Sequence, residues 1–408
     1  MKSTHESDTL EIIYVSIVTL LLTGAFFPMM LGSSSSLESN VFLNLLNVAT
    51  YLLAASLVLF NSHFDFKLIL KNWALYLLIL MCVVSVSWSV YPFESLKKTI
   101  NLLGVFVIAV YCSKRFHFVD ILCLLSEILF FISIVSLIFA LFIPKYGLMG
   151  LIEENGKHLG SWKGVFVHKN QLGKIMFIQV LISSYLFRYQ GNVKFAFFVL
   201  VAFIGILGSS STTALVLSLI SILLILSFKY SGKLRNWVKI TMLTVLVISG
   251  YILTNIESLV AIFGKDLTLT GRTFLWAELL SYVQQKPFFG YGYKGFWAGS
   301  GQMFSLTWKE APNAHNTFID IALDLGIMGL VLYIFYLISN FRLFFARQDQ
   351  WTVFGVSLFL ILFIYDFSES NALRYNNFSW FIMSLTSLSI HRTISQNVRN
   401  TKNKQSIG

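Results

Sequence analysis

The sequence predicts an all-α protein: a polytopic membrane helix bundle with about 12 transmembrane helices, forming a single transmembrane domain over residues 1–408. Three observations support this prediction. First, 56% of the 408 residues are hydrophobic and only 12% are charged, with a mean hydropathy of +0.73. A soluble domain does not carry so much apolar side chain. Second, the apolar residues gather in runs close to the ~20 residues that cross a bilayer. Third, the basic residues are divided unevenly between alternate loops.

The predicted helices follow the apolar runs along the chain. The first run is too long for a cleaved signal peptide and lacks a small-residue cleavage site, so it predicts a permanent helix. Two runs, 99–112 and 194–208, are short and need flanking residues or tilt to span. The runs are 10–31, 41–60, 72–90, 99–112, 119–143, 171–187, 194–208, 212–228, 237–254, 316–340, 351–366 and 376–391.

The basic residues predict the orientation in the membrane. Seventeen of the 30 Lys and Arg lie at the termini and in one set of short alternating loops. The positive-inside rule weighs short loops, so both termini are expected in the cytoplasm. The long segments 144–174 and 255–315 are then expected on the outer side, which is the periplasm if the protein lies in a bacterial inner membrane. The net charge of +11 follows from this topology, and its scattered residues argue against a nucleic-acid partner.

The chain offers no framework for a disulfide or a metal. Cys82, Cys112 and Cys123 fall in or beside apolar runs and show no paired spacing. The outward-facing histidines and glutamates lack a tight ligand spacing such as His-x-x-x-His. We therefore expect neither a metal nor a cofactor.

The segment 255–315, between the ninth and tenth predicted helices, is large enough to form a periplasmic substructure. Within it, "TGRTFLWAELLSYVQQKP" predicts an amphipathic helix over 271–285, with Thr270 as a cap and Pro287 as a stop. Its apolar stripe is expected to lie on the bundle or at the membrane surface; the stripe comprises Leu275, Trp276, Leu279, Leu280 and Val283.

Three polar clusters are expected to meet the same outer face of the membrane, although they are far apart in the sequence. His168, Lys169 and Asn170 crowd the outer end of one predicted helix. Glu369 and Arg374 lie in the last outer loop. The third cluster is the start of "HNTFIDIALDLGIMGL", where a membrane helix opens with His315 and Asn316.

At 100° per residue, this helix places His315, Ile319, Ala322, Gly326 and Gly329 on one face. Small residues let a neighbouring backbone approach, so this face is expected to look inward.

Polar residues punctuate the same helix. Asn316 is expected to cap it, and Asp320, one turn in, is expected near water. Asp324 lies ~14 Å from the helix start and needs a partner, a cavity or a proton.

Several of these stretches together resemble one family. "HN", nine residues and "GIMG" are similar to the signature of the O-antigen ligase and Wzy-type polysaccharide polymerase superfamily. "GRTFLWAELLSYVQQKPFFGYGYKGFW" resembles the segment that precedes that signature. "GVFVHKNQLG" and "SSSTTALV" resemble the exopolysaccharide polymerase branch, although many relatives carry Arg where this chain has Thr212 and Thr213. The resemblance covers roughly residues 160 to 380.

The resemblance implies a glycosyltransferase that acts at the outer leaflet. Its donor would be an oligosaccharide on a polyprenyl diphosphate, and the lipid diphosphate would leave. Arg272 is the candidate for holding that diphosphate, because a guanidinium matches phosphate oxygens and keeps its charge. His315 is the candidate general base, since histidine exchanges protons near neutral pH; it could instead bind the diphosphate as an imidazolium.

Six further residues are candidates for binding the substrate. Asn316 could orient the histidine or a sugar, and Lys169 could add charge for the phosphates. Glu369 is an alternative base or an acceptor for sugar hydroxyls. The set is Asn316, His168, Lys169, Asn170, Arg374 and Glu369.

Three functions remain in competition at this point. The first is a polymerase that joins lipid-linked repeat units of an exopolysaccharide, capsule or O-antigen, acting in the lipid bilayer with a chain-length regulator and a flippase as candidate partners. The second is a ligase that moves the finished chain to lipid A core or a protein. The third is a twelve-helix transporter or a flippase for lipid-linked oligosaccharides, which the lack of a repeat between the two halves disfavours.

Overall fold

The computed structural model describes residues 9–31, 40–60, 72–151, 156, 158–227, 272–298, 306, 313–347 and 350–390. Within these ranges the chain is helical and contains no β-strand, only an isolated bridge between Leu148 and Trp162. The all-α prediction is thereby confirmed.

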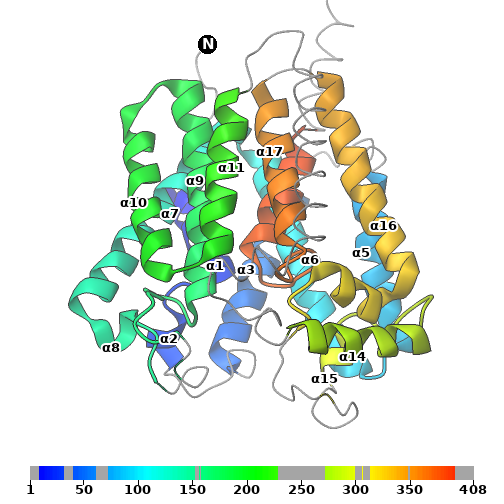
Figure 1. Ribbon diagram of the computed structural model, residues 1–408. Coiled ribbons are helices and arrows are strands. Elements are labelled where there is room, and N and C mark those ends of the chain that lie inside the picture. The colour runs from blue at the N-terminus through cyan, green and yellow to red at the C-terminus, as the bar shows by residue number, and fades with distance from the viewer. Residues whose placement is uncertain are drawn as a thin grey trace, which may run out of the picture.

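The helices of the bundle run side by side, and short or transverse helices, among them α14 and α15, lie at one end (Figure 1). They are α1 (Thr9–Thr23), α2 (Phe27–Leu31), α3 (Val41–Phe60), α5 (Trp73–Val84) continued by a 3₁₀ turn (Ser85–Trp88), α6 (Pro92–Arg115), α7 (Phe118–Phe142), α8 (Pro144–Gly147), α9 (Lys169–Gln190), α10 (Val193–Ser209), α11 (Thr212–Ser227), α14 (Arg272–Gln285), α15 (Gly295–Ala298), α16 (Thr317–Arg347) and α17 (Gln350–Tyr365). A last helix covers Phe378–Ile390.

The described helices include four that are long and apolar enough to cross a membrane: Val41–Phe60, Pro92–Arg115, Phe118–Phe142 and Thr317–Ala346. Shorter apolar helices accompany them. Eleven of the predicted runs coincide with helix, whereas 237–254 lies outside the described residues, so the count of twelve stays a prediction.

Helix α9 lies at the centre of one half of the bundle. It contacts α7, α10, α11 and α17, and almost every residue from Leu172 to Leu186 is buried. A helix that is apolar all round is stable only when neighbours cover every side. The outer helices differ, since they expose large apolar side chains such as Leu52 (66%) and Leu223 (64%). In a multi-pass membrane protein these faces meet lipid.

Helix α16 is broken at Gly326, which takes φ 65° and ψ −162°. The prediction of one continuous inward face from His315 through Gly326 and Gly329 is therefore wrong beyond the break. Gly326 is needed for its backbone, because a Cβ there would stand 2.3 Å from the carbonyl carbon of Phe288, and L-residues rarely adopt this φ.

The loop after α14 fills the break in α16. The amide of Ile327 donates to the carbonyl of Pro287 at 2.8 Å, and the amide of Tyr291 donates to the carbonyl of Leu323 at 2.7 Å. These bonds satisfy backbone groups that the break frees. Non-helical backbone at membrane depth is tolerated only where protein or a cavity covers it, and here the loop supplies that cover.

A buried ion pair joins the same loop to α16. Lys294 Nζ lies 2.8 Å from the Asp324 carboxylate, and the two side chains are 14% and 3% exposed. Asp324 was expected to need a partner, a cavity or a proton within the membrane, and Lys294 is that partner. Although burial opposes its charge, Asp324 raises the pKa of Lys294 above its usual value.

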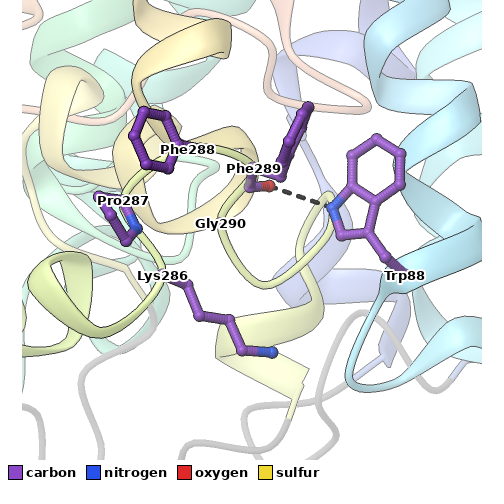
Figure 2. Close-up of a pocket in the computed structure, with 6 residues that line it drawn as sticks. All are labelled: Trp88, Lys286, Pro287, Phe288, Phe289 and Gly290. Carbon is purple, nitrogen blue, oxygen red and sulfur yellow. Dashed lines mark hydrogen bonds between the residues drawn. The ribbon is translucent and has the colours of Figure 1, made fainter.

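The outside of this loop forms a shallow apolar pocket of about 490 Å³. Figure 2 shows its lining and the hydrogen bond from the Trp88 indole to the Phe289 carbonyl, which measures 3.1 Å. Phe288 and Phe289 are 66% and 54% exposed. The lining residues are Trp88, Lys286, Pro287, Phe288, Phe289 and Gly290.

Candidate active site

Helix α14 carries Arg272 at its first residue and lies across one end of the bundle (Figure 1). It occupies the place of the predicted helix 271–285, while Thr270 lies outside the described residues. Leu275 and Leu279 bury its inner face, but Leu280, expected in the same stripe, is 48% exposed. The packed face fixes α14 on the bundle and so fixes where its first residue projects.

His315 lies at the start of α16 in an unusual backbone conformation. Its φ is +48°, a left-handed value that few residues other than glycine adopt. Three contacts hold this turn: the His315 amide donates to Asn313 Oδ1 at 2.9 Å, the Ala314 amide donates to Asp320 Oδ1 at 3.0 Å, and the Trp276 indole donates to the Ala314 carbonyl at 2.7 Å. The surroundings thus fix the position of the imidazole.

Asn316 begins α16 as its cap. Its Oδ1 accepts from the amides of Phe318 at 3.0 Å and Ile319 at 3.2 Å, which confirms the capping prediction. Its Nδ2 donates to the Phe367 carbonyl at 3.4 Å, and the residue is 8% exposed. These contacts give Asn316 a structural task; its predicted role toward substrate stays a prediction.

The last loop brings Glu369 between Arg272 and His315. Glu369 Oε1 accepts from Arg272 Nη2 at 3.0 Å, and Glu369 Oε2 lies 3.0 Å from His315 Nδ1. Arg272 Nη2 is also 3.4 Å from that nitrogen, and Arg272 Nη1 donates to the Ser368 carbonyl at 2.5 Å. Three segments distant in sequence therefore meet in one charged cluster, which we call the Glu369 cluster: Arg272, His315 and Glu369.

The electrostatics of the Glu369 cluster keep its acid ionised. Burial opposes the charge on Glu369, but the hydrogen bond from His315 and the Arg272 cation outweigh it and lower its pKa to about 2. The side chains of Arg272, His315 and Glu369 are 19%, 19% and 18% exposed. The cluster is thus held in place yet remains accessible.

Thr317 ties the start of α16 to the last loop. Its amide donates to the Asp366 carbonyl at 2.8 Å. Its hydroxyl donates to Asp366 Oδ1 at 2.6 Å and accepts from the Asn371 amide at 2.9 Å. Tyr333 also donates to the Asp366 carboxylate, and burial raises the pKa of Asp366 to about 7. This buried network sets the distance between Glu369 and His315.

The predicted group His168, Lys169 and Asn170 begins α9. His168 Nδ1 accepts from the Asn170 amide at 3.1 Å and caps the helix. Lys169 is 7% exposed, and its Nζ lies 3.5 Å from the Ser210 carbonyl. These contacts serve the junction of α9 with α11.

Two further predictions concern Arg374, expected to bind substrate, and Asp320, expected near water. Arg374 lies in the last loop, where its Nη1 donates to the Ser370 carbonyl at 3.4 Å. Asp320, expected near water, is only 3% exposed and accepts from the Trp297 indole at 2.9 Å. The expectation for Asp320 is therefore wrong, because Trp297 of α15 and the amide of Ala314 bind the carboxylate within the protein.

Sequence analysis missed two functional candidates, Lys174 and Asp366. Lys174 lies in α9, where its side chain is half-buried. A single lysine inside an apolar run was the available signal, since such residues are costly in a membrane unless they serve a purpose. As for metals, no group of three His, Cys, Asp or Glu suited to an ion occurs in the described ranges; a metal-free site stays a prediction.

Comparisons with known proteins relate the chain to glycan-transferring and exopolysaccharide proteins. Residues 196–334 match the O-antigen ligase family, Wzy_C. The chain is 27% identical over 354 residues to the exopolysaccharide production protein ExoQ of Rhizobium meliloti (strain 1021), covering 79% of this chain and 78% of that protein. It is 21% identical over 368 residues to a ComP-specific O-oligosaccharyltransferase of Acinetobacter baylyi, covering 84% and 66% respectively. The chain thus contains a segment of the O-antigen ligase family, and both relatives are consistent with the wider superfamily.

The segment that matches the O-antigen ligase family extends from α10 into α16. It includes Arg272 and His315 but ends before Glu369. Glu369 lies outside the matched segment and contacts Arg272 and His315 only in the folded chain.

Proposed function

We propose that this chain transfers a glycan from a polyprenyl diphosphate carrier at the outer face of the inner membrane, and that it polymerises repeat units of an exopolysaccharide, capsule or O-antigen. The observation that carries this proposal is the Glu369 cluster: a base, a cation and a carboxylate meet at one end of a membrane bundle, each still partly exposed. The match of residues 196–334 to the O-antigen ligase family supports the reaction class.

His315 acts as the general base through Nε2. An ionised carboxylate can only accept hydrogen bonds, so the Glu369 contact at 3.0 Å assigns the proton of a neutral imidazole to Nδ1. Nε2 then carries the lone pair. In this arrangement Glu369 orients the ring and stabilises the imidazolium that forms, as the acid of a catalytic triad does.

The bond changes follow from these roles. The acceptor hydroxyl oxygen attacks the anomeric carbon of the donor sugar while its proton passes to His315 Nε2. The bond between the anomeric carbon and the phosphate oxygen breaks, and its electron pair leaves with the lipid diphosphate. Arg272 offsets the charge that grows on this leaving group, the kind of electrostatic help that often dominates catalysis.

A ligase is the second candidate, because the two activities share this chemistry and differ in the acceptor. The family description and the relative from Acinetobacter baylyi favour transfer to another acceptor. The relative from Rhizobium meliloti, aligned over 78% of its length, favours polymerisation. We choose the polymerase on that relative and on the resemblance of "GVFVHKNQLG".

The test is transfer by the purified protein in detergent with a purified lipid-linked repeat unit as sole glycan. The polymerase makes longer lipid-linked glycans and releases lipid diphosphate, whereas a ligase needs an added acceptor and a flippase makes no new bond. His315→Ala should abolish product. His117→Ala, at an exposed position that begins α7, is the matched control and should retain it.

Two results would overturn the proposal. One is wild-type protein that lengthens no glycan with any acceptor. The other is full activity of His315→Ala at the wild-type melting temperature.

A further inference from the structure

Asp320 and Asp324 lie one turn apart in the first part of α16, before the break at Gly326. Residues four apart share a helix face, with their Cβ atoms ~5–6 Å apart. Both aspartates are at most 3% exposed. Lys294 Nζ binds Asp324 Oδ2 at 2.8 Å, and the Trp297 indole donates to Asp320 Oδ1 at 2.9 Å. The two acids are therefore enclosed together between α16 and the segment that contains α15.

One oxygen of each carboxylate has no donor. Asp320 Oδ2 and Asp324 Oδ1 are both buried, and neither accepts a hydrogen bond from a described residue. Burying such an atom is costly, and in native proteins a water or an ion commonly accounts for it. Because both atoms are acceptors, whatever satisfies them must be a hydrogen-bond donor or a cation.

The charges around these two oxygens favour a cation. In the described part of the chain, Lys294 is the one cation within salt-bridge distance of either carboxylate, so two acids against one lysine leave one negative charge. A proton on Asp320 is disfavoured, because its Oδ1 already accepts from the Trp297 indole and from the Ala314 amide at 3.0 Å. Hydrogen bonds of this kind favour the ionised carboxylate.

We infer that Asp320 Oδ2 and Asp324 Oδ1 bind a small monovalent cation such as Na⁺ between α16 and the segment around α15. Hard cations take oxygen ligands, and a single positive charge matches the excess, whereas a divalent ion would exceed it. The inference goes beyond the proposed function and does not depend on it. The prediction of no metal, made from the spacing of histidines and glutamates, would then not hold for this pair of aspartates.

The experiment is thermal unfolding of the full-length protein in detergent. NaCl replaces N-methyl-D-glucamine chloride at constant ionic strength, so that screening and the anion stay fixed. An ion that binds only the folded state should raise the melting temperature of the wild type by about 2 °C or more, with saturation. Asp320→Asn removes the excess charge and should lose most of this rise. Asp120→Asn, at an exposed position in α7, is the matched control and should keep it.

Three results would overturn the inference. One is a wild-type melting temperature that is the same in both salts, which would leave the two oxygens to water. Another is an Na⁺-dependent rise that Asp320→Asn retains in full, because the ion would then bind elsewhere. The third is a larger rise with MgCl₂ at the same ionic strength, which would contradict a monovalent site. Should Asp320→Asn not fold, Asp320→Ser, which keeps an acceptor and removes the charge, decides by the same criterion.

Discussion

Two carboxylates in this molecule are each bound to a cation within 3.0 Å, yet their surroundings differ. Asp324 pairs with Lys294 inside the break of α16, where the carboxylate side chain is 3% exposed. Glu369 pairs with Arg272 and His315 at the end of the bundle, where the three side chains are 18–19% exposed. A carboxylate–cation contact therefore occurs once in a buried position, at Asp324, and once in a partly exposed position, at Glu369.

The difference separates a structural ion pair from a site for chemistry. Lys294 and Asp324 join a loop to a broken helix, and both side chains are largely shielded from solvent. Each site also holds one residue in the left-handed region, Lys294 at φ +57° and His315 at φ +48°. Backbone strain therefore does not distinguish the two sites, whereas the exposure of their carboxylates does.

The largest loss of stability is expected for a substitution at Asp324. Asp324→Ala leaves Lys294 buried without its partner, which costs about 3–5 kcal/mol of unfolding free energy. The melting temperature in detergent should fall sharply, whereas Glu369→Gln should lower it less. The double variant Lys294→Met/Asp324→Leu should recover much of the loss. A single Asp324→Ala variant as stable as wild type would show that the pair does not hold the loop.

Arg272 tests the accessible side of the comparison. Arg272→Ala should reduce transfer by about 10²–10³-fold, the usual effect of removing a group that stabilises transition-state charge, with little change in melting temperature. Arg272→Lys should be intermediate, because lysine lacks the paired donors. Lys286→Ala is the control beyond the other end of α14, where that lysine lies over the Tyr291 ring. Equal losses in Lys286→Ala and Arg272→Ala would remove the special role of Arg272.

Gly290 tests whether the close approach between the loop and α16 contributes to stability. A Cβ at Gly290 would lie 2.5 Å from the Leu323 carbonyl oxygen, at φ +65°. Gly290→Ala should therefore cost ~1–3 kcal/mol through overpacking, measured by thermal unfolding. The control is Gly160→Ala, where φ is +78° and no atom lies within 4 Å. Equal costs at both glycines would mean that backbone strain, not the close approach of loop and helix, governs stability.

A pH dependence of stability is expected at Asp366. Burial raises its pKa to about 7, so the folded protein binds a proton that the unfolded chain releases near pH 3.9. This contribution to stability is full below about pH 4 and is lost as the pH rises to about 7. Asp366→Asn should flatten the stability curve in that window, whereas Asp120→Asn, at an exposed position in α7, should not. Parallel curves for wild type and Asp366→Asn would contradict the assignment.

Much of the architecture can be predicted from the sequence, because membrane-spanning helices are recognised by the length and hydropathy of their apolar runs. The break at Gly326 does not, since a glycine in an apolar run also fits close helix packing. Its cause lies in the backbone of Pro287 and Phe288, and no local pattern reports such a distant contact. The position of Glu369 between Arg272 and His315 is unpredictable for a related reason, because three segments distant in the sequence meet there only in the fold.

The central claim is that the Glu369 cluster is where the lipid-linked glycan reacts. The most direct measurement is an experimental structure of His315→Ala with a polyprenyl diphosphate-linked sugar bound. We predict phosphate density beside the Arg272 guanidinium and the first sugar beside the place of the missing imidazole. Phosphate density in the pocket between Trp88 and Phe289, with no ligand near Arg272, would contradict the account.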